Sequence, residues 1–200
     1  MSSLNKGLLC MWVAVLALWC GNLSAYELAT HARITTAAYA RSILSDASFM
    51  ESLGISGQDE FDRGRSEELR PIENRGTPEG WLRQGAVKED GFGCTDTRPT
   101  NHFFDPANDR PLTVLGHRLG LRSPDWALED SQDAEGHDFS LNDALERFRE
   151  AMSLPKKEER DRSFGSLFQT LGHVMYHVQD MAQLEHVRND AHQMTRGSHA

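Results

Sequence analysis

Apolar positions recur at helical spacing in three segments of the chain. In residues 156–182, after Pro155, seven apolar side chains recur every three to four residues and predict one long helix with a buried face. Residues 140–152 predict a second helix, because Ser140 is a good N-cap residue and Leu145, Phe148 and Met152 form an apolar stripe. Residues 26–53 predict a third. Since no segment alternates apolar and polar residues over the length of a strand, the predicted fold class is all-α.

Two stretches show no sustained period. Residues 54–112 are rich in Gly, Pro, Asp and Arg, and residues 123–138 contain Pro124, Gly136 and several acids. Such composition predicts irregular loops. A loop as long as the first is uncommon in a compact domain and usually has a function.

The N-terminus has the pattern of a secretory signal peptide. Lys6 precedes Leu8–Cys20, an unbroken apolar run of thirteen residues, and Ala25 supplies a small residue for cleavage. The run is too short for a bilayer core, which needs about 20 apolar residues. We therefore predict a signal peptide at 1–25, an exported mature domain at 26–200 that is periplasmic or secreted, and no stable membrane span after cleavage.

The charge of the chain limits the ligands it could bind, and its cysteine content limits the sources of its stability. The formal net charge of -9 disfavours a groove that grips a phosphate backbone through Lys and Arg. Cys10 and Cys20 would leave with the signal peptide, so Cys94 would have no partner for an internal disulfide. Metal binding is another source of stability for such a chain, because it contributes free energy to folding.

Histidines concentrate near the C-terminus, where five of the nine lie within the last 28 residues. On one helix, His177 lies about 40° from His173 and Asp180 about 20° on the other side, so the three share a face. Zinc accepts neutral imidazole nitrogen and carboxylate oxygen. A single histidine on an apolar helix is more often a hydrogen-bonded core residue, but three potential ligands on one face favour a metal site. His186 would lie just past the helix end and could hold a second ion.

Two upstream segments contain further ligand types: GAVKED, which ends in Asp90, and NHFFDP, which contains His102. Together with His31 in THARIT and the run LGHVMYHVQDMAQLEHVRND, they resemble the superfamily of zinc-dependent phospholipases C and fungal single-strand-specific zinc nucleases, over about residues 29–199. The resemblance implies a helical domain with up to three zinc ions at the bottom of a cleft. It implies these ligands: His31, Asp90, His102, Asp180, His186 and His199. Asp90 would also be the catalytic carboxylate, and His177 is a candidate ligand from the helical face alone.

The sequence departs from the family pattern at three points. The family histidine four residues before the aspartate is replaced by Tyr176, and a neutral tyrosine is a poor zinc ligand. Leu184 replaces the usual proline of the following turn. The family carboxylate about four residues after the counterpart of His199 would fall beyond Ala200, so we expect the domain to be incomplete at its C-terminus.

These features predict a zinc-dependent phosphodiesterase. A phospholipid-type ester is favoured over nucleic acid, because the chain is acidic and lacks interleaved basic and aromatic residues. The alternative is a truncated or decayed relative that binds metal or phosphate without turnover, which Tyr176 and the early end of the chain favour. A third hypothesis is a helical protein-interaction module in which the histidines have no metal-binding role.

Overall fold

A computed structural model describes residues 28–62, 75–90, 98–128 and 138–188, all within one compact unit of residues 26–191. Its helices are α2 (Leu28–Tyr39), α3 (Ala47–Ser52), α4 (Pro78–Asp90), α5 (Ser123–Leu128), α6 (Leu141–Ser153), α7 (Lys157–Asp180) and α8 (Leu184–Arg188), with the short 3-10 helices η1 (Ile43–Ser45) and η2 (Arg98–Asn101). Two small antiparallel sheets pair β1 (Phe61–Asp62) with β2 (Arg75–Gly76), and β3 (Thr113–Val114) with β4 (His117–Arg118). The predicted all-α class is confirmed.

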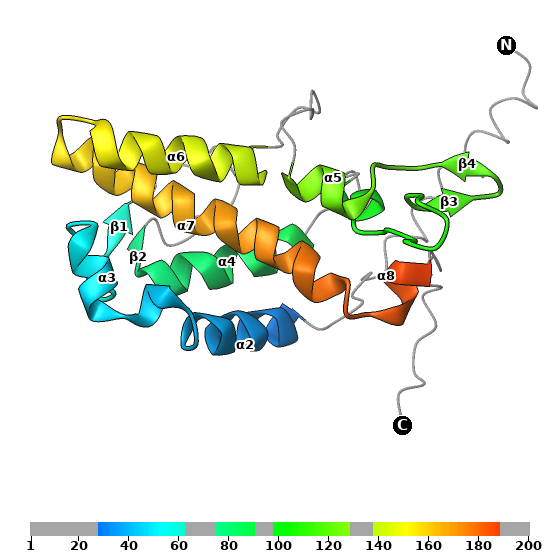
Figure 1. The fold of residues 1–200 in the computed structure, drawn as a ribbon, viewed down its shortest axis with the longest axis horizontal. Coiled ribbons are helices and arrows are strands. Elements are labelled where there is room, and N and C mark those ends of the chain that lie inside the picture. Colours follow the sequence, from blue (N-terminus) through cyan, green and yellow to red (C-terminus); the bar gives the residue numbers. More distant parts are fainter. Residues whose placement is uncertain (1–27, 63–74, 91–97, 129–137, 189–200) are drawn as a thin grey trace, which may run out of the picture. The chain divides into compact units, whose positions relative to one another are not determined.

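The long helix α7 organises the fold. It packs against α4 and against α6, and α2 packs against α4 (Figure 1). Phe164 and Phe168, in the first half of α7, join Trp81 and Leu82 of α4 in the apolar core. The second half of α7, from His173 to Asp180, instead presents buried polar side chains. One helix therefore carries both the core and the candidate site.

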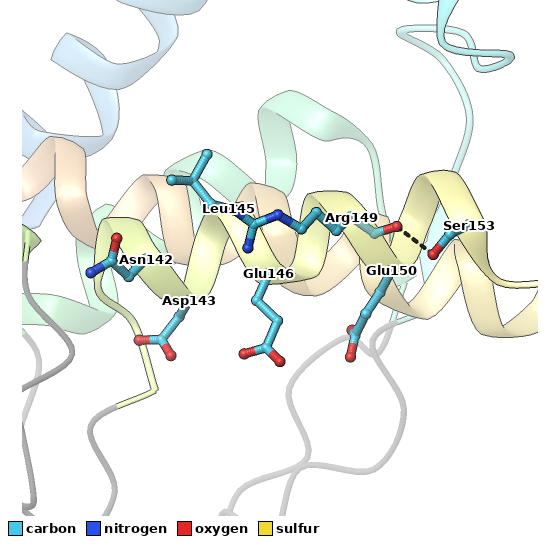
Figure 2. Close-up of a pocket in the computed structure, with 7 residues that line it drawn as sticks. All are labelled: Asn142, Asp143, Leu145, Glu146, Arg149, Glu150 and Ser153. Atoms are coloured by element: carbon cyan, nitrogen blue, oxygen red, sulfur yellow. Dashed lines mark hydrogen bonds between the residues drawn. The ribbon is translucent and has the colours of Figure 1, made fainter.

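The predicted helices at 140–152 and 156–182 are confirmed as α6 and α7, but the apolar stripe of α6 is not its buried face. Leu145, Phe148 and Met152 keep 45%, 37% and 47% of their surface exposed, whereas Ala144 and Ala151 are buried. Small residues let α6 approach α7 closely, and this decides which face is covered. Figure 2 shows a pocket on the exposed side, lined by residues of α6 alone. None of them belongs to the predicted site.

Removing the N-cap of α6 should destabilise the protein measurably. Ser140 Oγ accepts a hydrogen bond from Asp143 N at 3.1 Å, and Asp143 Oδ2 accepts one from Ser140 N at 2.7 Å. Ser140→Ala should therefore lower the free energy of unfolding by about 1 kcal/mol in urea denaturation. The matched control is Ser153→Ala, because exposed Ser153 only donates to the Arg149 carbonyl at the other end of α6. Equal losses in both variants would contradict a capping role.

The single helix predicted at 26–53 is wrong. α2 ends at Tyr39, and the chain continues as η1 and α3, each with its own N-cap. Ser42 Oγ accepts from Leu44 N, and Asp46 Oδ1 accepts from Ser48 N and Phe49 N. These side chains compete with the continuous helix for backbone donors, so the helix restarts twice.

The irregular loop predicted at 54–112 is also wrong in part, because α4 occupies Pro78–Asp90. α4 crosses α7 at a pair of glycines. A Cβ on Gly85 would lie 2.0 Å from the Gln169 carbonyl oxygen, and a Cβ on Gly172 would lie 2.2 Å from the Leu82 carbonyl oxygen. Gly85, whose residue type favoured a loop in the sequence, therefore permits close packing of α4 against α7.

The predicted signal peptide at 1–25 and the predicted ligand His199 lie outside the described residues. Within the described ranges, no helix has both the length and the apolar character needed to cross a membrane.

Candidate metal centre

The C-terminal half of α7 supplies one polar face to the protein interior. Spacings of three and four residues join His173 to Tyr176 and His177, and join these two to Asp180, and all four side chains are buried. Helical periodicity places such residues on one side of the helix. The last turn of α4 lies opposite this face, because Glu89 contacts His173 and His177 and Asp90 contacts Tyr176.

Glu89 lies at the centre of the first group of contacts. Its Oε2 accepts from His173 Nδ1 at 2.6 Å and from Arg98 Nη1 at 3.0 Å, and the side chain is fully buried. Its Oε1 accepts from Trp126 Nε1 at 3.2 Å. Burial by itself would raise the pKa of Glu89, but the surrounding imidazoles, with the hydrogen bond from His173 among their contacts, hold this pKa well below its usual range. Glu89 is therefore an anion in the protein interior.

Glu89, His102 and His177 form a buried group that could hold a metal ion, since their ligand atoms all lie within 4.8 Å of one another. Glu89 Oε1 lies 3.5 Å from His102 Nε2 and 3.3 Å from His177 Nε2. Two ligands of one tetrahedral zinc ion lie roughly 3.3 to 3.6 Å apart, because each binds at about 2.0 to 2.2 Å. The observed separations are those of atoms that could share one metal ion.

Each of the five histidines that are buried among the described residues uses Nδ1 to contact a protein group. The contacts are His31 with Gln179 Oε1 at 2.8 Å, His102 with Tyr176 Oη at 3.1 Å, His173 with Glu89 Oε2 at 2.6 Å, His177 with Ser123 Oγ at 2.9 Å and His186 with the His102 carbonyl at 3.0 Å. Metal-binding histidines commonly hold one ring nitrogen in this way and present the other to the metal. Nε2 of His31 faces Asp180, and Nε2 of His102 and His177 faces Glu89, whereas His186 meets Asp180 through Nδ1.

Asp180 organises a second group, with one histidine on each carboxylate oxygen. His31 Nε2 lies 3.8 Å from Oδ1, and His186 Nδ1 lies 3.0 Å from Oδ2. The Gln179 carboxamide oxygen can only accept, so His31 Nδ1 carries a proton and, in the neutral ring, Nε2 is a lone-pair nitrogen. Burial lowers the pKa of His31, which favours this neutral form. His31 Nε2 and Asp180 Oδ1, both electron-rich, thus face each other. A cation between these two atoms would stabilise the arrangement.

Asp90 and Tyr176 connect the two groups. Tyr176 Oη donates to Asp90 Oδ1 at 3.1 Å and lies 3.1 Å from His102 Nδ1. Asp90 Oδ2 is buried, and no hydrogen-bond donor of the described residues reaches it. Burial, together with the negative charge of Asp180, raises the pKa of Asp90 to about 7, although the Tyr176 hydrogen bond opposes the shift.

The NHFFDP box has a structural explanation. Asn101 Oδ1 accepts from Leu121 N at 2.8 Å, the Phe103 ring stacks on His186 at 4.5 Å between centroids, and Asp105 Oδ1 accepts from Ala107 N in the following turn. Phe104 N also donates to the His186 carbonyl. These contacts hold His102 against α8 and the last turns of α4 and α7.

Six of the predicted site residues, His31, Asp90, His102, His177, Asp180 and His186, are buried in these adjoining groups. The prediction omitted Glu89, and it included His173 on the metal-binding face of the helix but not among the ligands. Adjacent acids in GAVKED were a signal for Glu89, but they did not show which one faced α7. His173 shares the predicted helical face, and here its Nδ1 donates to Glu89.

Comparison with protein-family models, with curated proteins and with solved structures found no match to this chain. Membership of the zinc phospholipase C and nuclease superfamily stays a prediction from the motifs.

Proposed function

We propose that this protein is a zinc-dependent phosphodiesterase of the phospholipase C and nuclease type. The observation that carries the proposal is the common orientation of the five buried histidines, each held through Nδ1 by a protein partner. A buried imidazole needs a hydrogen-bond partner in any fold, but in a metal centre the other ring nitrogen also faces further ligand atoms, as Nε2 of His102 and His177 faces Glu89.

The charges of the site support a bound cation. Glu89 has Arg98 as a partner, but Asp90 and Asp180 are contacted in the described part of the chain by imidazole, phenol and amide groups rather than by Lys or Arg. Several buried carboxylates in one place repel each other and lose hydration. Divalent ions would offset both costs.

Glu89, His102 and His177 would hold one zinc ion, and Asp180 with His31 and His186 would hold the others. When bound, zinc polarises a phosphoryl oxygen and makes a water molecule more acidic. Tyr176 holds Asp90 by Oδ1, so Oδ2 can accept a proton from the attacking water. A phospholipid-type phosphate ester is the favoured substrate, because the net charge of -9 opposes binding of a polyanionic strand.

Loss of a ligand histidine should remove zinc and hydrolysis together. Purified protein should contain zinc and should hydrolyse a chromogenic phosphocholine ester faster than single-stranded DNA. His177→Ala should weaken zinc binding by more than about tenfold, because even partners of ligands contribute that much. The matched control is His117→Ala, since His117 lies exposed in β4. Zinc content would be measured by elemental analysis, and hydrolysis with both substrates.

The outcomes separate the competing functions. Zinc in the wild type with no hydrolysis of either substrate would support the non-catalytic relative, which the phenol of Tyr176 among the ligand atoms favours. An absence of zinc would contradict both. Unchanged zinc affinity in His177→Ala would remove His177 from the site.

A further inference from the structure

Tyr176 has a place in the site that zinc coordination by histidine and carboxylate does not explain. Its side chain is fully buried, and its ring lies 4.4 Å from that of His31 and 4.7 Å from that of His102, measured between centroids. The hydroxyl reaches two functional groups, Asp90 Oδ1 and His102 Nδ1, each at 3.1 Å. It therefore joins the carboxylate that ends α4 to the imidazole of the NHFFDP box.

The directions of these two hydrogen bonds depend on each other. A phenol has one proton to donate, and a carboxylate only accepts. Because Tyr176 donates to Asp90, its oxygen can only accept from His102, so Nδ1 of His102 must carry the hydrogen. In the neutral imidazole the lone pair then belongs to Nε2, which lies 3.5 Å from Glu89 Oε1 on the side of His177.

We propose that Asp90 and Tyr176 are positioning residues which hold His102 in the Nδ1–H tautomer and so present Nε2 to the metal. The inference rests on the proposed metal site of Glu89, His102 and His177. It gives Tyr176 a role that differs from direct coordination, for which a neutral phenol is poorly suited. A carboxylate commonly orients a metal-binding histidine directly, and here the phenol lies between the two.

Zinc affinity tests the role of the hydroxyl. Tyr176→Phe should bind zinc about 10 to 100 times more weakly than wild type, as expected for loss of a group that orients a ligand. The matched control is Tyr39→Phe, because Tyr39 packs against the apolar core at the end of α2. Competition with a chelator of known affinity would measure binding, and unfolding of the metal-free variants would show that both remain folded. Equal zinc affinity in Tyr176→Phe and wild type would overturn the proposal.

The tautomer can be measured without metal. NMR spectra would be recorded on metal-free protein with nitrogen-15 in its histidine rings. The two ring-nitrogen signals of His102 would be assigned as those that disappear in His102→Gln. In wild type we expect His102 to carry its hydrogen on Nδ1. In Tyr176→Phe we expect His102 to be in the Nε2–H tautomer or in a mixture of the two tautomers. An Nε2–H ring in wild type would overturn the inference and leave the proposed function intact. Wild-type protein that shows the expected tautomer but binds no zinc would instead overturn the proposed function.

Discussion

Glu89→Gln should abolish tight zinc binding and destabilise the metal-free protein by about 3 kcal/mol. Glutamine preserves the shape of the side chain but not its charge. Arg98 and His173 would then lose the anion that each contacts, and breaking a buried ion pair by removing one partner commonly costs about 3 to 5 kcal/mol. The proposed metal would also lose its carboxylate ligand, and hydrolysis should fall to background.

The two effects would be measured separately. Urea denaturation with chelator present reports the stability of the metal-free protein, and zinc titration reports affinity. Glu79→Gln is the matched control, because Glu79 lies in the first turn of the same helix and accepts a hydrogen bond from Thr36 Oγ1. Wild-type zinc affinity in Glu89→Gln would contradict a ligand role for Glu89. Wild-type stability would contradict its role as the buried anion that pairs with Arg98 and His173.

Gly85→Ala should destabilise the protein by about 3 kcal/mol and weaken zinc binding as well. The added Cβ would lie 2.0 Å from the Gln169 carbonyl oxygen and 3.0 Å from Gly172 Cα, so α4 and α7 would have to separate. Overpacking of this kind costs about 1 to 3 kcal/mol, and backbone atoms cannot rotate away as a side chain could. Since Glu89 follows Gly85 by about one turn of α4, the shift would also move Glu89 away from His177.

Gly80→Ala is the control for this prediction. It lies in the same helix, but its added Cβ would approach only the Thr77 hydroxyl, at 3.3 Å. Alanine is favoured over glycine in a helix by about 1 kcal/mol, so this variant should be as stable as wild type or more stable. Thermal unfolding would compare the two variants. Equal stability would show that the crossing of α4 and α7 tolerates a methyl group.

Helix formation was predictable wherever local signals and burial agreed. α7 has a long apolar period, and α6 begins with Ser140 and Asp143, which form its capping box. α4 gave no such signal, because Gly80 and Gly85 reduce helix propensity and its stability depends on contact with α7. The close approach at Gly85 and Gly172 leaves no apolar period in α4 from which this helix could be predicted.

The types of residue in the site were predictable, but their partners were not. Spacing and resemblance together singled out His102, His177 and Asp180, and the structure buries all three in adjoining groups. The choice between Glu89 and Asp90 needed the orientation of α4. Adjacent helical residues point about 100° apart, and packing alone turns Glu89 toward the imidazoles and Asp90 toward Tyr176.

Local patterns along the chain were enough to predict the helical class, the clustering of histidines on α7 and the kinds of ligand available to a metal. The ring nitrogen that each histidine uses depends on tertiary packing, because partners such as Gln179, Ser123 and Tyr176 come from other segments of the chain. Tyr176 shows the difference most clearly. Its residue type argues against coordination, yet its position between Asp90 and His102 gives it a role through hydrogen-bond geometry, which exists only once three segments of the chain have packed together.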